Sequence, residues 1–174
     1  MGFINIIKII VDSKSELKEK LRGSTSDNLI LGENSEVERD FYIFKVEAEN
    51  GLSTILEIGV ISEGHGLQPE CKLIDERHIC IGVNKEVHII DIYNFLKRCT
   101  VMFDSLFYEF ISLERKDRII VLQELGLTCI SLDGVKLWEH STNVINDYKV
   151  EKDRIVLITD EFSITILKDT GEII

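Results

Sequence analysis

The first residues of the chain form an apolar segment followed by a short amphipathic one. Residues 3–11 are rich in isoleucine, which favours a β-strand. Residues 14–22 place Leu17 and Leu21 four positions apart, which is the spacing of one helical face. Ser13, with a glutamate three residues later, forms the capping box that is typical of a helix start. The pattern therefore predicts a strand followed by one short helix.

Two further apolar segments, 41–48 and 53–61, lie on either side of Asn50-Gly51. An Asn-Gly pair in this position is typical of a tight β-hairpin, because both turn residues need positive φ. A two-residue turn at this position also predicts which side chains face each other across the hairpin. The predicted pairs are Ile43 with Ile58 and Phe41 with Val60.

Beyond a glycine-rich loop, one strand pattern recurs three times, at 77–82, 117–122 and 153–158. In each copy a polar or charged pair precedes a run of mostly apolar residues. Each copy has one strand-like segment before it and two after it, separated by short polar turns. The preceding segments are 71–74, 108–113 and 148–150. The first segments after the recurring strand are 87–92, 127–132 and 163–167, and the second are 95–99, 135–138 and 172–174. Short strands at regular spacing indicate repeated antiparallel meanders.

These patterns predict a mainly β protein of stacked antiparallel β-meanders, arranged as an incomplete propeller or a sandwich, with one short N-terminal helix. We expect a single domain over residues 1–174. Strand, helix and hairpin would occupy 1–70, and three meander repeats would occupy 71–174. An incomplete array leaves a terminal face open. The helix or a second copy of the chain would cover this face, and a homodimer is the favoured arrangement.

The segment Leu132-Asp133-Gly134-Val135-Lys136-Leu137-Trp138 ends one strand in an Asp-Gly turn and carries Leu-Trp in the next. Together with 153–157 and 166–173, it resembles a blade of the WD40 or quinoprotein-like β-propeller class. The resemblance covers residues 71–174 and implies local blade topology. The chain departs from the class because Gly-His and Trp-Asp dipeptides are absent from their usual places. A closed propeller typically needs four to eight blades. This chain offers three, or four if 41–70 supplies an irregular one.

Acidic side chains outnumber basic ones by 31 to 20, which gives a formal net charge of −11. The excess is spread along the sequence, and no basic stripe points to nucleic acid. An acidic surface fits a soluble protein, or one whose partner is basic. No apolar run has the length of a membrane span, and the first residues do not resemble a signal peptide. The four cysteines form no Cys-x-x-Cys pair and so give neither a zinc nor a redox motif. Free thiols together with the lack of a signal peptide predict a cytoplasmic protein, in a bacterial-type cytoplasm.

Candidate chemistry rests on loose groups of residues, because the sequence contains none of the common nucleotide-binding, metalloprotease or serine-hydrolase motifs. The first group is centred on His65, which lies between two glycines, with Glu63 and Glu70 nearby in the sequence. Glycines allow a ligand to approach closely, and histidine can act as a base. The alternative is a histidine in a flexible turn.

A second group consists of His78, Cys80 and His88 on two consecutive predicted strands. His78 and Cys80 are two residues apart, so they would point to the same face of one strand. Imidazole and thiolate are ligands for soft metals. The alternative is a core thiol beside hydrogen-bonded histidines, and the sequence predicts no cofactor.

Aromatic residues gather in one part of the chain and suggest a partner or dimer surface. The predicted interface residues are Tyr93, Phe95, Phe103, Phe107, Tyr108 and Trp138. The alternative is core packing between the first two repeats. The sequence thus favours a cytoplasmic, non-enzymatic protein-interaction module, in its sharper form an immunity-like protein that binds a basic toxin. The rival hypothesis is a small-ligand-binding protein or a hydrolase with a site near His65.

Overall fold

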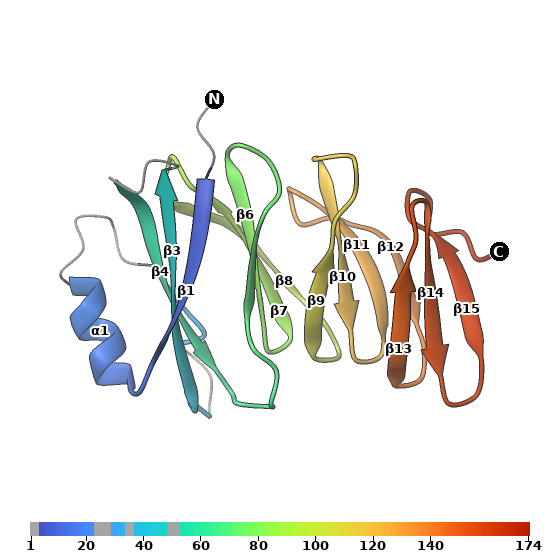
Figure 1. Ribbon diagram of the computed structural model, residues 1–174, viewed down its shortest axis with the longest axis horizontal. Coiled ribbons are helices and arrows are strands. Elements are labelled where there is room, and N and C mark those ends of the chain that lie inside the picture. Colours follow the sequence, from blue (N-terminus) through green and yellow to red (C-terminus); the bar gives the residue numbers. More distant parts are fainter. Residues whose placement is uncertain (1–3, 23–28, 34–36, 49–52) are drawn as a thin grey trace.

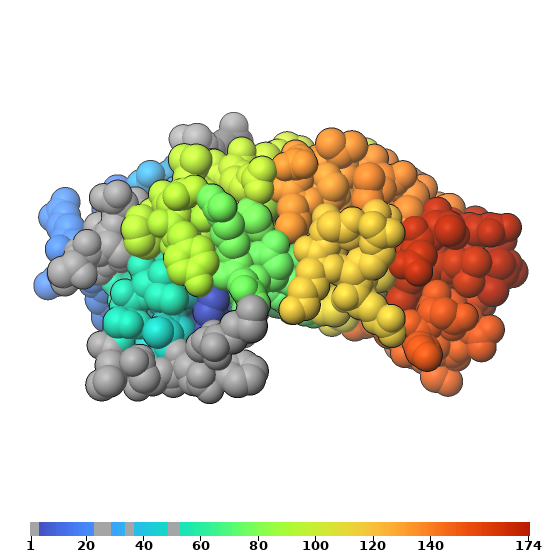
Figure 2. Space-filling view, turned by 90° about the horizontal axis from the view of Figure 1, so that it is seen from above, coloured from blue at the N-terminus to red at the C-terminus, as the bar shows by residue number. Residues whose placement is uncertain are grey.

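The computed structural model describes residues 4–22, 29–33, 37–48 and 53–174, which form four β-sheets and one helix. Figure 1 shows the sheets side by side in chain order, with α1 (Lys14–Arg22) at the N-terminal end of the row. Seen from above, the row bends into an arc (Figure 2). The predicted mainly β fold of stacked antiparallel sheets with one short helix is confirmed.

The described residues include fifteen strands. In chain order these are β1 (Ile4–Val11), β2 (Leu29–Leu31), β3 (Asp40–Ala48), β4 (Thr54–Ser62), β5 (Glu70–Leu73), β6 (His78–Val83), β7 (Glu86–Asp91), β8 (Leu96–Met102), β9 (Phe107–Ile111), β10 (Arg118–Gln123), β11 (Gly126–Ser131), β12 (Lys136–Ser141), β13 (Ile145–Val150), β14 (Arg154–Thr159) and β15 (Ser163–Leu167). Within the same part of the chain, no helix is long and apolar enough to cross a membrane.

The first sheet has the order β1-β3-β4-β2, and α1 covers its outer face. The helix begins as predicted, because Ser13 Oγ accepts a hydrogen bond from the Glu16 amide at 3.1 Å. Leu17 and Leu21 are buried against the sheet. Gly59 makes room for them, since a Cβ at this position would lie 2.8 Å from Leu21 Cδ1. The helix therefore closes the N-terminal end of the row.

The register predicted for the β3–β4 hairpin is wrong by one residue. Ile43 pairs with Gly59 instead of Ile58, and Phe41 pairs with Ile61 instead of Val60. The cause is a β-bulge at Val46/Glu47, which inserts one extra residue between the turn and the paired strands. The predicted turn residues Asn50-Gly51 lie outside the described residues.

The next three sheets are meanders with the orders β5-β6-β7-β8, β9-β10-β11-β12 and β13-β14-β15. Neighbouring residues of their middle strands belong to different core clusters. On β6, Ile79 and Ile81 pack against the first sheet, while Cys80 packs against the third. On β10, Val121 faces the second sheet and Ile120 faces the last. These strands are apolar on both faces because each sheet lies between two others.

The last sheet is shorter than predicted. Residues 172–174 were expected to form its fourth strand, but their ladder is reduced to a single bridge between Ile166 and Ile173. Gly171, with a φ of 75°, turns the chain immediately before this bridge. Ile155 and Leu157 on β14 face the core, whereas Ile158 is exposed on the opposite face. Among the described residues, a helix therefore covers the N-terminal end of the row, and no helix covers the outer face of the last sheet.

Candidate functional site

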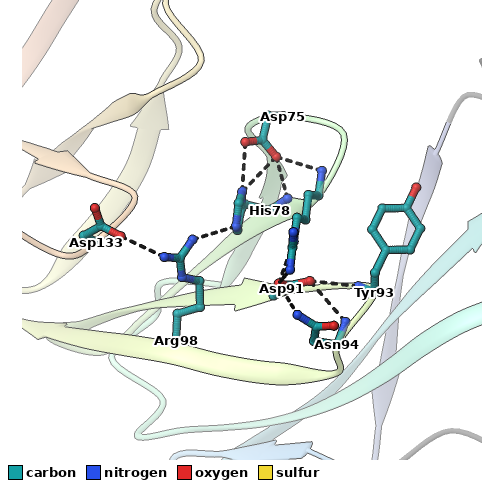
Figure 3. A network of polar contacts seen from close by, with 8 residues as sticks. Asp75, His78, Asp91, Tyr93, Asn94, Arg98 and Asp133 are labelled. Carbon is teal, nitrogen blue, oxygen red and sulfur yellow. Dashed lines mark hydrogen bonds and ion pairs between the residues drawn. The ribbon is translucent and has the colours of Figure 1, made fainter.

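The turn between β7 and β8 is held by a buried carboxylate at its first residue. Asp91 Oδ1 accepts hydrogen bonds from the backbone amides of Tyr93 and Asn94, both at 3.1 Å. Its second oxygen, Oδ2, accepts one from the Asn94 side-chain amide at 2.9 Å. This is the pattern in which an aspartate side chain closes a turn on its own backbone. These hydrogen bonds therefore fix the backbone conformation from residue 91 to residue 94 (Figure 3).

Arg77, from the turn before β6, completes the surroundings of Asp91. Its Nε and Nη2 atoms lie 2.7 Å and 2.6 Å from Asp91 Oδ2. Burial acts to raise the pKa of the Asp91 carboxyl, but the amide hydrogen bonds and the guanidinium outweigh it and lower that pKa. The charge of buried Asp91 is thus compensated by the Arg77 guanidinium and by hydrogen-bond donors. Asp91 thereby joins two turns of the second sheet.

Three large side chains project into solvent from this turn. Tyr93 is 59%, Phe95 40% and Leu96 59% exposed. Phe95, predicted as the first residue of a strand, instead has a φ of 54°, which is the left-handed region that non-glycine residues rarely adopt. Such strain persists only where surrounding contacts impose it, and it gathers at functional positions. We refer to Tyr93, Phe95 and Leu96 as the exposed turn.

A chain of polar contacts runs from the second sheet to the third beside the β7–β8 hairpin (Figure 3). His78 Nδ1 lies 2.8 Å from Asp75 Oδ2, and Arg98 Nη1 donates to His78 Nε2 at 2.9 Å. Arg98 Nη2 reaches Asp133 Oδ1 in the β11–β12 turn at 2.8 Å. Burial acts to raise the pKa of Asp75, but hydrogen bonds from His78 and Arg77 lower it overall. The chain of contacts joins two sheets beside the exposed turn.

The aromatic residues predicted for an interface separate into two groups. Tyr93 and Phe95 are exposed together, as described above. Phe103 and Phe107 are buried between the second and third sheets, so the core-packing alternative describes them. Tyr108 and Trp138 are partly buried against the cluster between the third and last sheets.

The three candidate metal ligands do not converge. His78 is engaged by Asp75 and Arg98, and Cys80 is buried in the core, where burial raises the pKa of its thiol. His88 is opposite Ile81, so it points to the other face of the sheet from Cys80, which is opposite Ile89. No group of three or more histidine, cysteine or acidic side chains among the described residues is placed to hold a metal ion.

The His65 loop brings together two of its three candidate residues. His65 Nε2 lies 2.8 Å from Glu63 Oε2 on the surface. Glu70 lies elsewhere, since its Oε2 accepts the Phe110 amide hydrogen at 2.8 Å and links β5 to β9. Burial raises the pKa of the Glu70 carboxyl.

A cavity of about 550 Å³ lies beside this loop but is not lined by His65. It lies between the first two sheets, and its polar lining includes Glu63, Asn84, Glu86, His88 and Thr100. His88 is buried, with Nδ1 3.0 Å from Thr100 Oγ1 and Nε2 3.2 Å from a Glu86 oxygen, the latter outside hydrogen-bond geometry. The pKa of Glu86 is lowered chiefly by this histidine.

Sequence reasoning missed Asp91, Arg77 and Arg98. The signal for Asp91 was present, because an aspartate that ends an apolar strand and precedes Tyr93-Asn94 is typical of a turn closed by its own side chain. Arg77 and Arg98 carried no such signal. Their partners lie 14 and 35 residues away, in other turns.

No family model matches the sequence, and no curated protein matches it. Among solved structures, dihydro-heme d1 dehydrogenase NirN is similar with a TM-score of 0.58 and 9% identity, over 78% of this chain and 33% of its own. BamB from Moraxella catarrhalis is similar with a TM-score of 0.51 and 13% identity, over 99% of this chain and 51% of its own. This chain therefore spans about a third to a half of those proteins. Both are propeller-type proteins, so the resemblance to β-propeller blades is confirmed and the fold is propeller-like.

Proposed function

We propose that the protein is a non-enzymatic protein-interaction module whose contact surface is centred on the exposed turn. The observation that carries the proposal is that Tyr93, Phe95 and Leu96 are exposed on a backbone held by buried Asp91. Large apolar side chains on a rigid support are typical anchors of protein interfaces, because ordering them costs little entropy on binding.

The partner in this proposal is a basic protein in the cytoplasm, as an immunity-like role requires. The formal net charge of −11 supports a basic partner, since opposite charges accelerate encounter and favour the correct orientation. The inhibitor of a toxin must contact it tightly without chemistry of its own. A rigid apolar anchor on an acidic protein has the properties that this task demands.

Affinity capture from an extract of the source organism tests the proposal. The tagged native chain is compared with the variant Tyr93→Ala/Phe95→Ala, and captured proteins are quantified by mass spectrometry. We expect at least one basic protein to be recovered with the native chain and lost with the variant. Direct titration of that purified protein should then show an affinity decrease of about 100-fold, which is typical of truncating two interface anchors.

The matched control is Val135→Ala/Leu137→Ala, which truncates two exposed apolar residues in the neighbouring sheet. This control should retain the captured protein. Equal recovery with all three versions, or recovery of no partner, would refute the exposed turn as the contact surface. Two differently tagged copies of the chain, mixed in the same experiment, test the self-association that the sequence favours.

A second candidate function is binding of a small polar ligand in the cavity of about 550 Å³. Its volume falls within the range of typical ligand sites, and it combines carboxylates with buried His88 and with Lys97. Thermal unfolding with a metabolite library tests this candidate. A true ligand should raise the Tm of the native chain and leave unchanged the Tm of Thr100→Phe, which fills the cavity. A library without any stabilising compound argues against the candidate.

A further inference from the structure

One end of the strand rows forms a continuous surface across the second, third and last sheets. The turns β6–β7, β10–β11 and β14–β15 lie at this end, together with the loops that connect the sheets. Backbone hydrogen bonds join these segments in sequence: Phe103 N to Lys85 O, Glu124 N to Leu106 O and Thr142 N to Leu125 O, at 2.8–2.9 Å. Asn143 Nδ2 then donates to Glu161 Oε2 at 2.9 Å. The turns are therefore neighbours and present one surface.

This surface is strongly acidic. Residues 84–86, 103–106, 124–125, 142–147 and 160–162 hold six acidic side chains and one lysine. Five of the carboxylates form what we call the acidic end: Asp104, Glu124, Asp147, Asp160 and Glu161. Within the described residues, none of these five has a lysine, arginine or histidine nitrogen within 4.0 Å, because they appear in none of the ion pairs of that part of the chain.

The opposite end of the same rows has a different charge balance. Residues 75–77, 91–95, 112–118, 132–136, 149–154 and 168–172 hold ten acidic and nine basic side chains. Several of them pair directly, as Asp133 does with Arg98, Asp117 with Arg115, and Glu151 with Arg154. The acidic excess looked evenly spread along the sequence, but in three dimensions the repeated turns gather much of it at one end.

Apolar side chains are interleaved with the unpaired carboxylates. Met102, Leu125, Val144 and Phe162 are each between 41% and 58% exposed. They come from four different turns or strand ends of the same surface. We call these four side chains the apolar row. Exposed large apolar side chains among charged ones are typical of a protein contact surface rather than of a solvated face.

We propose that the acidic end is a docking surface for a lysine- or arginine-rich segment of a protein partner that also carries apolar side chains. Charge complementarity selects this occupant, since five carboxylates without a cation of their own would gain one from the partner. The exposed apolar row would contact the partner's apolar side chains. The inference rests on the proposed function as an interaction module, and it adds a second contact surface for the basic partner, at the end of the strand rows opposite the exposed turn.

Binding of defined peptides by the full chain tests the inference. The probes are two fluorescent dodecapeptides, one alternating lysine with leucine and one alternating lysine with serine. Anisotropy titrations are run at low and at physiological ionic strength. We expect both peptides to bind, with the lysine–leucine peptide tighter, and the affinity of both to fall with salt because exposed charges are screened.

Two variants of equal charge change locate the site. Glu124→Gln/Asp160→Asn/Glu161→Gln removes three charges from the acidic end, and Glu76→Gln/Glu114→Gln/Asp153→Asn removes three from the opposite end. The first should weaken binding of both peptides by about tenfold and flatten the salt dependence, since each exposed ion pair contributes modestly. The second should change binding by less than twofold. Equal effects of the two variants would mean attraction by net charge alone and would overturn the inference.

A third variant, Leu125→Ser/Phe162→Ser, tests the apolar row. It should weaken the lysine–leucine peptide severalfold and leave the lysine–serine peptide unchanged, and no difference between the peptides would refute the apolar contribution. Circular dichroism and thermal unfolding confirm that each variant is folded. Tyr93→Ala/Phe95→Ala should bind both peptides like the native chain. Failure at the acidic end can therefore be told apart from failure of the exposed turn.

Discussion

Arg98 Nη1 donates a hydrogen bond to His78 Nε2 across 2.9 Å, so two basic side chains share one direct contact. The guanidinium keeps its protons at any physiological pH, and the imidazole nitrogen must therefore accept. This places the imidazole proton on Nδ1, where it faces the Asp75 carboxylate at 2.8 Å. A neutral histidine thus connects an anion in one turn to a cation on β8.

Replacement of this histidine should destabilise the fold. His78→Leu removes the imidazole from both Asp75 and Arg98, although Asp75 keeps its two backbone amide donors and Arg98 keeps Asp133. We expect the free energy of unfolding to fall by about 1–2 kcal/mol, because two hydrogen bonds of the imidazole are lost. Urea denaturation measures this loss. His65→Leu is the matched control, since exposed His65 has one surface partner and should change stability by less than about 0.5 kcal/mol. Equal losses would contradict the assigned role of His78.

Stability should fall in acid partly through Asp91. The pKa of Asp91 is lowered in the folded state. The unfolded chain therefore takes up a proton at higher pH than the folded one, and the contribution to stability is complete above the unfolded pKa of about 4. It is lost as the pH falls from there through the folded pKa. Unfolding free energies measured between about pH 6 and pH 2 should decline less steeply in Asp91→Asn than in the native chain.

The control for this pH series is Asp104→Asn, which alters an exposed carboxylate without an ion pair in the described structure. Its pH profile should follow that of the native chain. A slope in Asp91→Asn as steep as the native one would show that Asp91 contributes nothing to the acid response.

Gly171 should tolerate no side chain, for reasons of both backbone and space. Its φ of 75° disfavours other residues, and a Cβ would lie 2.5 Å from Trp138 Cγ. Gly66 has a similar φ of 81° but nothing within 4 Å of a Cβ. Gly66→Ala should therefore cost about 1 kcal/mol for backbone strain alone, and Gly171→Ala about 2–3 kcal/mol.

Urea denaturation gives both costs, and fluorescence gives an independent reading. Trp138 is the single tryptophan of the chain, so its emission should shift in Gly171→Ala and stay unchanged in Gly66→Ala. Equal stability losses and an unchanged emission would mean that Gly171 does not pack on Trp138.

Much of the architecture was readable from local pattern. The helix over 14–22 and most strands follow from apolar periodicity and turn residues, because these signals act within a few positions. The register of the β3–β4 hairpin could not be predicted from the local sequence pattern. The bulge at Val46/Glu47 shifts every later pair, and nothing in the local sequence marks it.

The candidate site was less predictable than the fold. Tyr93 and Phe107 look alike as aromatic residues in one dense segment, yet the first is exposed and the second buried. What separates them is non-local. Tyr93 lies in a turn whose backbone is bound by Asp91, whereas Phe107 enters a space left by Gly82 on a different strand. A high density of aromatic residues in the sequence therefore predicts a cluster, but it does not predict which of those side chains are buried and which are exposed.

The pair of Gly82 and Phe107 offers the most direct test of how the second and third sheets pack. Gly82 has ordinary strand geometry, so a side chain there would meet no backbone strain. A Cβ would overlap the Phe107 ring at Cε2 and Cζ. Gly82→Ala should therefore cost about 2–3 kcal/mol of unfolding free energy by overpacking.

Phe107→Leu removes two of the three ring atoms that a Cβ at position 82 would meet and should by itself cost about 1–2 kcal/mol. In the double variant the alanine methyl occupies the vacated space, so the loss should be at least about 1 kcal/mol smaller than the sum of the single losses. Phe103→Leu provides the control, because Phe103 belongs to the same cluster but is not among the nearest atoms to Gly82. Its losses should add to those of Gly82→Ala. Additive losses in both pairs would mean that Phe107 does not occupy the space beside Gly82, and the packing of these two sheets would then differ from the one described.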